Sequence, residues 1–281
     1  MNALELKNLS KTYKGFKLQN VSLELPQGCI MGLIGENGAG KTTVIKLILD
    51  IVKKDSGQVY IMGKDVSDGG FKELKEDIGV VLDDVGCPEC ITPKQFDRIM
   101  EGTFKKWNGE NYRRLIDKFG LEDNKKFGEM SKGMKMKMGI AAAMSHGAKL
   151  LILDEATSGL DPVARDEVID MLYEYTRDPG HSVLISSHIV TDLEKLCDYI
   201  CFLKDGQVVL LEEKDAILEK YGIVRCSGEA LKDIDPAAVV GVKRSPYGVE
   251  AAVKKAFIPA GMTVGRLGIE ELFVFMAKEE N

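Results

Sequence analysis

A glycine-rich segment between an apolar stretch and a helical pattern constrains this chain more than any other feature. The segment runs from Gly35 to Thr42 as GENGAGKT, which fits the pattern GxxxxGK[ST]. The stretch CIMGLIG before it predicts a buried strand, and TTVIKLILDIV after it has apolar residues at helical spacing. Glycines let backbone N–H groups face an anion, and the following helix presents its positive end. The segment therefore predicts a phosphate-binding loop, with Lys41 at the β- and γ-phosphates and Thr42 on Mg²⁺.

A second apolar strand ends in two adjacent carboxylates. Residues 150–153 (LLIL) are followed by Asp154 and Glu155. Beside a phosphate loop, Asp154 is placed to hold Mg²⁺ and Glu155 to take a proton from the attacking water. Alternation along a strand makes the two side chains face differently, which allows separate roles.

The other apolar stretches predict a sheet with helices beside it. Short alternating strands are expected over residues 3–9 and 18–25, and buried strands over 78–82, 150–153 and 183–186. Helical patterns separate the buried strands, as in folds built around a parallel sheet. The sequence therefore predicts an α/β fold with a largely parallel central sheet.

Changes of pattern divide the chain into parts. Between Thr92 and Phe119 the pattern becomes helical, polar and aromatic, which predicts a helical insert. We expect a main domain over residues 1–221, with a helical subdomain at about 84–148. Residues 222–281 are expected to form a small α+β appendage, a βαββα-like stretch that closes with the helix GIEELFVFMAK.

Composition argues against two kinds of interaction. The formal net charge of -6 does not suit a large nucleic-acid footprint, which needs a basic surplus. No apolar run approaches the roughly 18 residues of a membrane span, and the N-terminal segment lacks the apolar core of a signal peptide. If the chain acts at a membrane, we expect another chain to cross it.

The six cysteines are expected to be reduced thiols. Only Cys87 and Cys90 have motif spacing, in CPEC, and no second ligand pair for zinc is evident. Chance spacing and a redox or metal role both stay open for this pair. His146 and His181 match no motif and are interpreted as ordinary surface or loop histidines.

Four further motifs occur in a fixed order around the phosphate loop and the carboxylates. Tyr13 lies in LSKTYKGF, Ser131 in MSKGM, Asp161 in SGLD, and His188 ends SVLISSH. Over residues 3 to about 212 this order resembles that of ATP-binding-cassette (ABC) ATPases. The resemblance implies a P-loop NTPase of the ABC type, with a mixed sheet core, an antiparallel β subdomain and a helical subdomain, followed by the appendage.

The resemblance also implies roles for individual residues. His188 resembles the family's switch histidine and would act in catalysis with Glu155. Tyr13 resembles the aromatic residue that stacks on adenine, and it also fits a half-buried aromatic of a strand. Ser131 and Gly133 resemble the signature sequence that meets a second copy's nucleotide. The residues expected to contact ATP are Tyr13, Gly35, Asn37, Gly38, Ala39, Gly40, Lys41, Thr42, Thr43, Ser131, Gly133 and Asp161.

The signature sequence departs from the family pattern. MSKGM has Lys132 and Met134 where LSGGQ is common, while Ser131 and Gly133 remain. A hydroxyl, a glycine N–H and a helix N-terminus still suffice to meet a phosphate. The lysines around this helix fit a solvated basic face, with a dedicated anion site as the alternative.

A second departure lies at the end of IGVVLD, where Asp83 replaces a glutamine. Asp83 is predicted to act in catalysis and to contact Mg²⁺ together with Thr42 and Asp154, since Mg²⁺ favours oxygen ligands. The alternative is that Asp83 turns away and caps the loop before the next helix.

The resemblance implies an ATP-hydrolysing motor that uses ATP and Mg²⁺. Its expected partners are a second identical or homologous copy and a membrane-spanning permease, at the cytoplasmic face of a cell membrane. SKGMKMKMGIA and ILDEATSGLDP are similar to sequences of Gram-positive exporters of antimicrobial or cytolytic peptides. The alternatives are a soluble mechanical ATPase acting on DNA or ribosomes, which would show coiled coils or paired cassettes, and a P-loop kinase, which needs no signature sequence.

Overall fold

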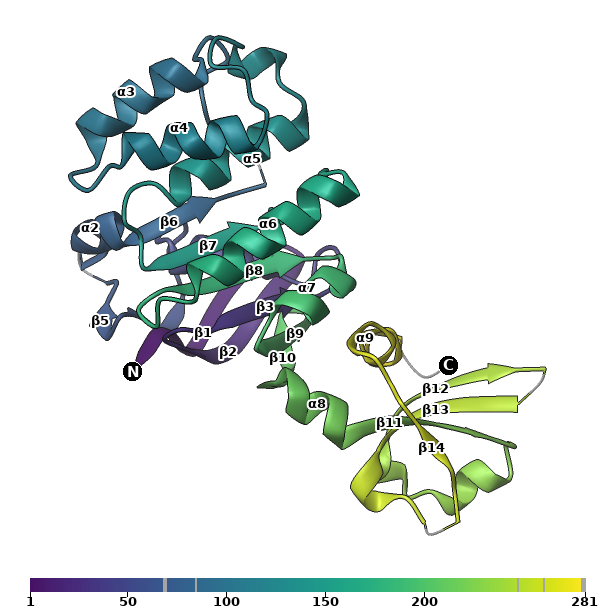
Figure 1. Ribbon diagram of the computed structural model, residues 1–281. Coiled ribbons are helices and arrows are strands. Elements are labelled where there is room, and N and C mark those ends of the chain that lie inside the picture. The colour runs from purple at the N-terminus through teal and green to yellow at the C-terminus, as the bar shows by residue number, and fades with distance from the viewer. Residues whose placement is uncertain (68–69, 84, 247, 260, 279–281) are drawn as a thin grey trace.

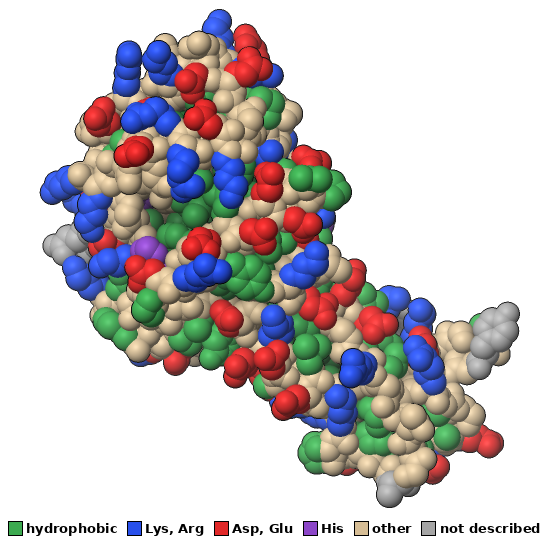
Figure 2. All heavy atoms as spheres, in the orientation of Figure 1, with side chains coloured by type: hydrophobic (Ala, Val, Ile, Leu, Met, Phe, Trp, Pro, Cys, Tyr) green, Lys and Arg blue, Asp and Glu red, His purple; other side chains and the backbone are tan. Residues whose placement is uncertain are grey.

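The computed structural model describes residues 1–67, 70–83, 85–246, 248–259 and 261–278 (Figure 1). Residue 84, where the helical subdomain was expected to begin, and residues 279–281 of the expected appendage lie outside the described residues. Within the described ranges, no helix is both long and apolar enough to span a bilayer. On the face shown in Figure 2, acidic and basic side chains are interspersed.

A six-stranded sheet forms the centre of the main body. Its strands follow the order β10-β9-β3-β8-β7-β6, and neighbours are parallel except for β9 and β10. Every residue of β3, β7 and β8 is buried, as expected for strands covered on both faces. The prediction of a largely parallel central sheet is confirmed. The strands are β3 (Ile30–Ile34), β6 (Ile78–Val81), β7 (Leu150–Asp154), β8 (Ser182–Ser187), β9 (Tyr199–Lys204) and β10 (Gln207–Glu213).

An antiparallel sheet packs beside the central one in the order β2-β1-β4-β5. Its apolar side chains share a core with helix α1 (Lys41–Ile48), which contributes Val44 and Ile45. The helix that carries the phosphate loop is therefore held between two sheets. The strands are β1 (Asn2–Tyr13), β2 (Phe16–Pro26), β4 (Ser56–Ile61) and β5 (Lys64–Asp65).

Three helices form a layer at one end of the molecule, above β6 in Figure 1. They are α3 (Pro93–Thr103), α4 (Gly109–Lys118) and α5 (Lys132–Ala143), and the short helix α2 (Gly70–Leu74) precedes β6. Thr92 starts α3 with a capping box. The expectation for His146 was wrong in part: it is 3% exposed, stacks on Phe104 and lies 3.0 Å from the Ile78 carbonyl oxygen. His181 is partly exposed and stacks on Tyr175.

The C-terminal part contains a third sheet in the order β12-β13-β11-β14. The expected βαββα order was wrong at its first helix: two 3₁₀ turns, Ala230–Asp233 and Pro236–Ala238, stand there, and β14 is an additional strand. Pro236 explains the turns, because a proline disfavours helical backbone at the residue before it. The elements of this part are α8 (Lys214–Lys220), β11 (Tyr221–Cys226), β12 (Val239–Ser245), β13 (Gly248–Lys254), β14 (Val264–Gly265) and α9 (Ile269–Ala277). Helices α6 (Pro162–Tyr175) and α7 (Val190–Leu196) belong to the main body.

Helix α9 turns back from the third sheet to the main body (Figure 1). Ile269 and Leu272 belong to the same buried core as Leu193 and Leu196 of α7. Phe273 lies beside Phe202 of β9, with ring centroids 5.6 Å apart. The last helix of the chain therefore completes the core of the main body.

Candidate functional site

The phosphate loop joins β3 to α1. Gly38 and Gly40 take left-handed backbone conformations, with φ of 88° and 110°, which glycine adopts without steric cost. A Cβ on Gly35 would lie 2.5 Å from the Leu203 carbonyl oxygen. The glycines therefore permit a tight turn at a helix N-terminus, which is a ready site for phosphate.

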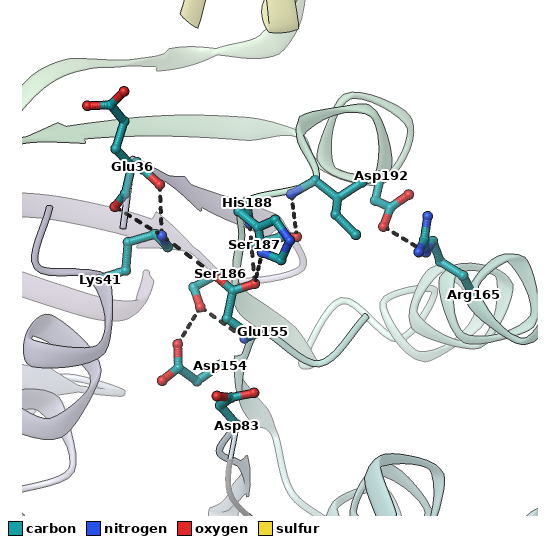
Figure 3. Close-up of polar contacts among 12 residues, drawn as sticks. Glu36, Lys41, Asp83, Asp154, Glu155, Arg165, Ser186, Ser187, His188 and Asp192 are labelled. Carbon is teal, nitrogen blue, oxygen red and sulfur yellow. Dashed lines mark hydrogen bonds and ion pairs between the residues drawn. The ribbon is translucent and has the colours of Figure 1, made fainter. Parts of the chain in front are cut away.

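Lys41 begins α1, and its ammonium group lies inside the loop. The side chain is buried, and Nζ donates a 2.7 Å hydrogen bond to the Gly35 carbonyl oxygen. Nζ also lies 3.5 Å from Glu155 Oε1 (Figure 3). A positive charge in this place can neutralise phosphate oxygens held by the loop.

Asp154 lies at the end of β7 and is 1% exposed. Its Oδ1 accepts a 2.5 Å hydrogen bond from the Ser186 hydroxyl on the neighbouring strand β8. Among the described residues no cation pairs with this carboxylate, although a buried carboxylate requires a charge partner. Thr42 adds an exposed hydroxyl at the start of α1. These oxygen donors suit Mg²⁺, so the metal fits the residues present.

Glu155 follows Asp154 in the sequence. Two groups of His188, its ring and its backbone N–H, contact the Oε2 atom of Glu155. Its Oε2 lies 2.6 Å from His188 Nδ1, and the His188 backbone N–H donates to the same oxygen at 3.3 Å. The backbone of Glu155 is left-handed, with φ of 54°, which costs a non-glycine residue about 1–3 kcal/mol. The turn aims the carboxylate between Lys41 and His188, a position suited to a general base (Figure 3).

A cavity of about 690 Å³ opens over the phosphate loop. It brings together residues that lie far apart in the sequence. Its lining residues are Gly15, Phe16, Glu36, Asn37, Gly38, Gly40, Lys41, Thr42, Thr43, Asp83, Lys132, Glu155, Ser158 and His188. The cavity thus brings together part of the expected site, from the loop, the ends of β6 and β7, and the end of β8.

Several predicted site residues do not line this cavity. Tyr13 ends β1 and is 40% exposed, while Phe16 at the start of β2 is the aromatic residue in the lining. Gly35 and Ala39 belong to the loop but do not face the cavity, and Asp154 lies behind it.

The residues expected to meet a second copy's nucleotide also lie outside the cavity. Ser131 caps α5, with its hydroxyl accepting from the Met134 N–H at 3.3 Å, and it is exposed. Gly133 packs closely on the Gly159 carbonyl oxygen. Asp161 caps α6, and the N–H of Ala164 lowers the pKa of its carboxyl. All three therefore lie at or near helix N-termini beside the cavity.

Asp83 was predicted either to contact Mg²⁺ or to cap the following loop, and its observed surroundings include a lysine that neither prediction contained. It lines the cavity, and its Oδ1 lies 2.6 Å from Lys132 Nζ at the start of α5. Both side chains are 53% exposed. Within the described residues no backbone N–H donates to this carboxylate, so the loop cap is not observed. Two of the positions that depart from the family pattern, Asp83 and Lys132, are therefore in contact with each other.

Six residues of the site were not predicted from the sequence: Gly15, Phe16, Glu36, Lys132, Ser158 and Ser186. Phe16 and Ser158 lie within the quoted motifs without a distinguishing feature, and Lys132 was weighed only as part of a basic face. Ser186 could have been suspected, because it lies two residues before His188 in a strand next to the carboxylates.

The thiols of Cys87 and Cys90 are free. Burial raises the pKa of Cys87, which is the opposite of what a redox-active thiolate needs. Within the described residues, no three His, Cys, Asp or Glu side chains are grouped as a metal site. The raised pKa of Cys87 therefore argues against a redox-active thiolate at this pair.

Comparisons with known proteins agree with this geometry. The family model described as "ABC transporter" matches residues 18–158. The lantibiotic transport ATP-binding protein SrtF of Streptococcus pyogenes is 33% identical over 215 residues, which cover 75% of this chain and 91% of that protein. The bacitracin transport ATP-binding protein BcrA of Bacillus licheniformis is 34% identical over 212 residues, covering 73% and 67%.

Solved structures resemble the fold. An ATP-binding subunit of an ABC transporter aligns with a TM-score of 0.69 and 29% identity, covering 76% of this chain and 91% of that one. A dimeric ATP-binding cassette in a post-hydrolysis state with ADP and Pi aligns with a TM-score of 0.68 and 23% identity, covering 75% and 98%. The fold seen here is therefore that of a nucleotide-binding cassette.

Proposed function

This chain belongs to the ABC transporter family of ATPases, and from that premise we propose that it is the ATP-hydrolysing subunit of a bacterial exporter. The observation that carries the proposal is the cavity in which Lys41, Glu155 and His188 converge on the phosphate loop. ATP bound there would place its γ-phosphate near a fixed cation and a carboxylate base. The named relatives act in transport, which favours this function over a mechanical ATPase on DNA or ribosomes.

In this proposal the residues in and around the cavity have separate roles. The loop N–H groups and Lys41 hold the β- and γ-phosphates, and Glu155 accepts the proton of the attacking water. His188 keeps Glu155 in place through the 2.6 Å contact. Tyr13 is proposed to stack on adenine, and Phe16 lies nearer to the loop as a second aromatic surface.

Mg²⁺ is proposed to bind at Thr42 and Asp154, with Asp83 as a further oxygen ligand. The metal would supply positive charge at the phosphate oxygens. Ser186 orients Asp154 through the hydrogen bond that its hydroxyl donates to Oδ1. Asp83 would have to leave Lys132 in order to reach the metal.

The active unit is proposed to be a dimer. Ser131, Gly133 and Asp161 lie beside the cavity of their own chain and outside its lining. In a head-to-tail pair they would meet the nucleotide held by the other copy. The dimeric cassette with a similar fold supports this arrangement.

The partner that crosses the membrane is proposed to be a separate permease, so this chain would act at the cytoplasmic face. Because two relatives are named for lantibiotic and bacitracin transport, antimicrobial or cytolytic peptides are the proposed cargo class. We also propose the division into an ATPase domain at 1–221, its helical subdomain near 84–148, and an α+β part at 222–281.

The test of the function uses Glu155→Gln. This change keeps the size and polarity of the side chain but removes the base, so turnover should fall by about 10² to 10⁴ while ATP binding persists. ATPase assays and gel filtration with and without Mg-ATP measure the two effects. ATP should shift the variant from monomer to dimer, since hydrolysis no longer reopens the pair. Near-normal turnover would remove Glu155 from the role of base.

A further inference from the structure

A buried acid lies outside the nucleotide cavity, between two helices that follow catalytic segments. Asp192 of α7 is 5% exposed, and its Oδ2 lies 3.4 Å from Arg165 Nε of α6 (Figure 3). Neither of these two atoms has a well-aligned hydrogen bond. Burial raises the pKa of Asp192, and the Thr157 hydroxyl and Arg165 oppose that rise. Burying the Asp192 carboxylate beside the partly exposed Arg165 carries a cost in desolvation.

Arg165 connects this acid to the loop at residues 158–161. Its Nη2 donates a 3.3 Å hydrogen bond to the Leu160 carbonyl oxygen. Thr157, which begins the same turn, is fully buried beside Asp192. Asp192 therefore lies beside the start of the loop that carries Ser158 of the cavity lining, and it reaches the end of that loop through Arg165.

Asp192 is also connected to His188 through the first turn of α7. It lies four residues after His188, in the helix whose entry is fixed by the Ser187 hydroxyl accepting from the Ile189 N–H at 3.0 Å. His188 in turn contacts Glu155, which stands two residues before Thr157. The contacts close a ring that runs from Glu155 through His188, α7, Asp192 and the 158–161 loop back to Glu155.

We propose that Asp192, acting through Arg165, is a positioning residue that couples the 158–161 loop to His188. The inference rests on the proposed function, because the loop is expected to act across the dimer. The pair spans 3.4 Å without good hydrogen-bond alignment, so it has room to tighten when the dimer closes. A movement of the 158–161 loop would then be transmitted to α7, and a movement of α7 to the loop. The position of the general base Glu155 would in this way depend on the dimer interface.

The chain offers a matched control. Lys195 of α7 and Asp166 of α6 form a 3.5 Å ion pair between the same two helices, with side chains 64% and 68% exposed. This pair contacts neither the loop nor His188 in the described structure. Asp166→Asn removes an exposed inter-helix ion pair outside the ring, whose charges act on Asp192 without contacting it, and Asp192→Asn removes one within the ring.

The first measurement is steady-state ATPase kinetics with monomer nucleotide affinity. Asp192→Asn should lower kcat by about 10- to 100-fold, the effect of slight misplacement of reacting groups. ATP affinity of the monomer should stay within about twofold, because Asp192 lies outside the cavity. Asp166→Asn should leave both values unchanged. Equal effects of the two variants, or unchanged kcat in a folded Asp192→Asn, would overturn the proposal.

A second measurement separates positioning from folding. The double variant Arg165→Met with Asp192→Leu leaves no uncompensated buried charge, so its stability should approach that of the native chain. Its kcat should remain low, and recovery to the native value would contradict the coupling.

The histidines provide a spectroscopic readout, since the chain has only three. In Asp192→Asn, the imidazole NMR signal of His188 should move at fixed pH, while that of His181 stays in place; an unmoved His188 signal counts against the proposal. A native chain without ATPase activity would instead refute the proposed function.

Discussion

The Glu155 side chain is contacted on both of its carboxylate oxygens. A general base has to lie within hydrogen-bonding reach of the proton that it accepts. Glu155 is 15% exposed and is contacted by Lys41 on one oxygen and His188 on the other. The left-handed turn at this residue shows that the backbone accepts strain to aim the carboxylate.

The role of Asp83 can be decided by a Mg²⁺ titration at fixed ATP. In Asp83→Asn the Mg²⁺ concentration for half-maximal ATPase activity should rise, because an anionic oxygen ligand is lost. Asp83→Gln should restore much of the native value. Lys132→Gln should lower the midpoint by no more than about fivefold, because it frees Asp83 from a half-exposed ion pair. Superimposable curves would leave Asp83 with the ion pair as its only role.

The cysteines should differ sharply in reactivity. Cys197 and Cys201 are buried, and burial raises the pKa of Cys201 to about 12, so neither forms the thiolate at neutral pH. Cys90 is exposed and should react first with a disulfide reagent. Labelling followed by peptide mapping, with unfolded protein as the control, measures the order. Early labelling of Cys197 would mean that α7 opens readily.

At the scale of elements, the start of α5 combines three features of the signature sequence. Ser131 caps the helix, Lys132 contacts Asp83, and a Cβ on Gly133 would lie 3.0 Å from the Gly159 carbonyl oxygen. The first turn of this helix contains no acidic residue. Its exposed N-terminal end is therefore positive and open to a phosphate from outside the chain.

Ser131→Arg should test whether this helix end acts across the dimer. The bulky side chain should block ATP-dependent dimerisation in a Glu155→Gln background, because Ser131 is exposed beside the cavity. Monomer nucleotide affinity should be almost unchanged. Gel filtration with and without Mg-ATP compares the single and double variants. A double variant that still dimerises would show that Ser131 does not face the partner's nucleotide.

The elements with strong periodicity could be predicted from the sequence, and those set by tertiary contacts could not. The strand, loop and helix around Lys41 follow from local pattern alone, because glycine and apolar spacing both specify them. The ion pair of Asp83 with Lys132 joins residues 49 positions apart, so no local sequence pattern predicts it. The 3₁₀ turn at Pro236 carried a local signal, since proline opposes a helix there. Phe16 lines the cavity through the β1–β2 turn, which neighbouring residues do not reveal.

At the scale of the molecule, α9 joins the C-terminal part to the main body. Leu272 is 1% exposed and belongs to the core cluster that also contains Tyr112 of the helical layer. The third sheet also has a small core of its own, including Val224 and Ala251. Stability of the main body should therefore depend on α9 more than on this sheet.

Leu272→Ala should destabilise the whole chain by about 2–5 kcal/mol, the usual cost of truncating a buried leucine. Urea unfolding followed by the fluorescence of Trp107, the only tryptophan, reports this in the distant helical layer. Val274→Ala, on the same helix and 41% exposed, is the control. A Trp107 transition that does not move in Leu272→Ala would make the C-terminal part an independent unit.

The pairing of β3 affects how the chain folds during its synthesis on a ribosome. β3 bears the phosphate loop and pairs with β8 and β9, with Ile30 opposite Val183. At 5–20 residues per second, about 8 to 30 s pass between the synthesis of these two residues. During that interval a wholly apolar strand has no neighbour in its own sheet, so a nascent-chain chaperone or the early β1–β2 sheet has to shield it. Codons that slow translation before β8 would lengthen this exposure and increase aggregation.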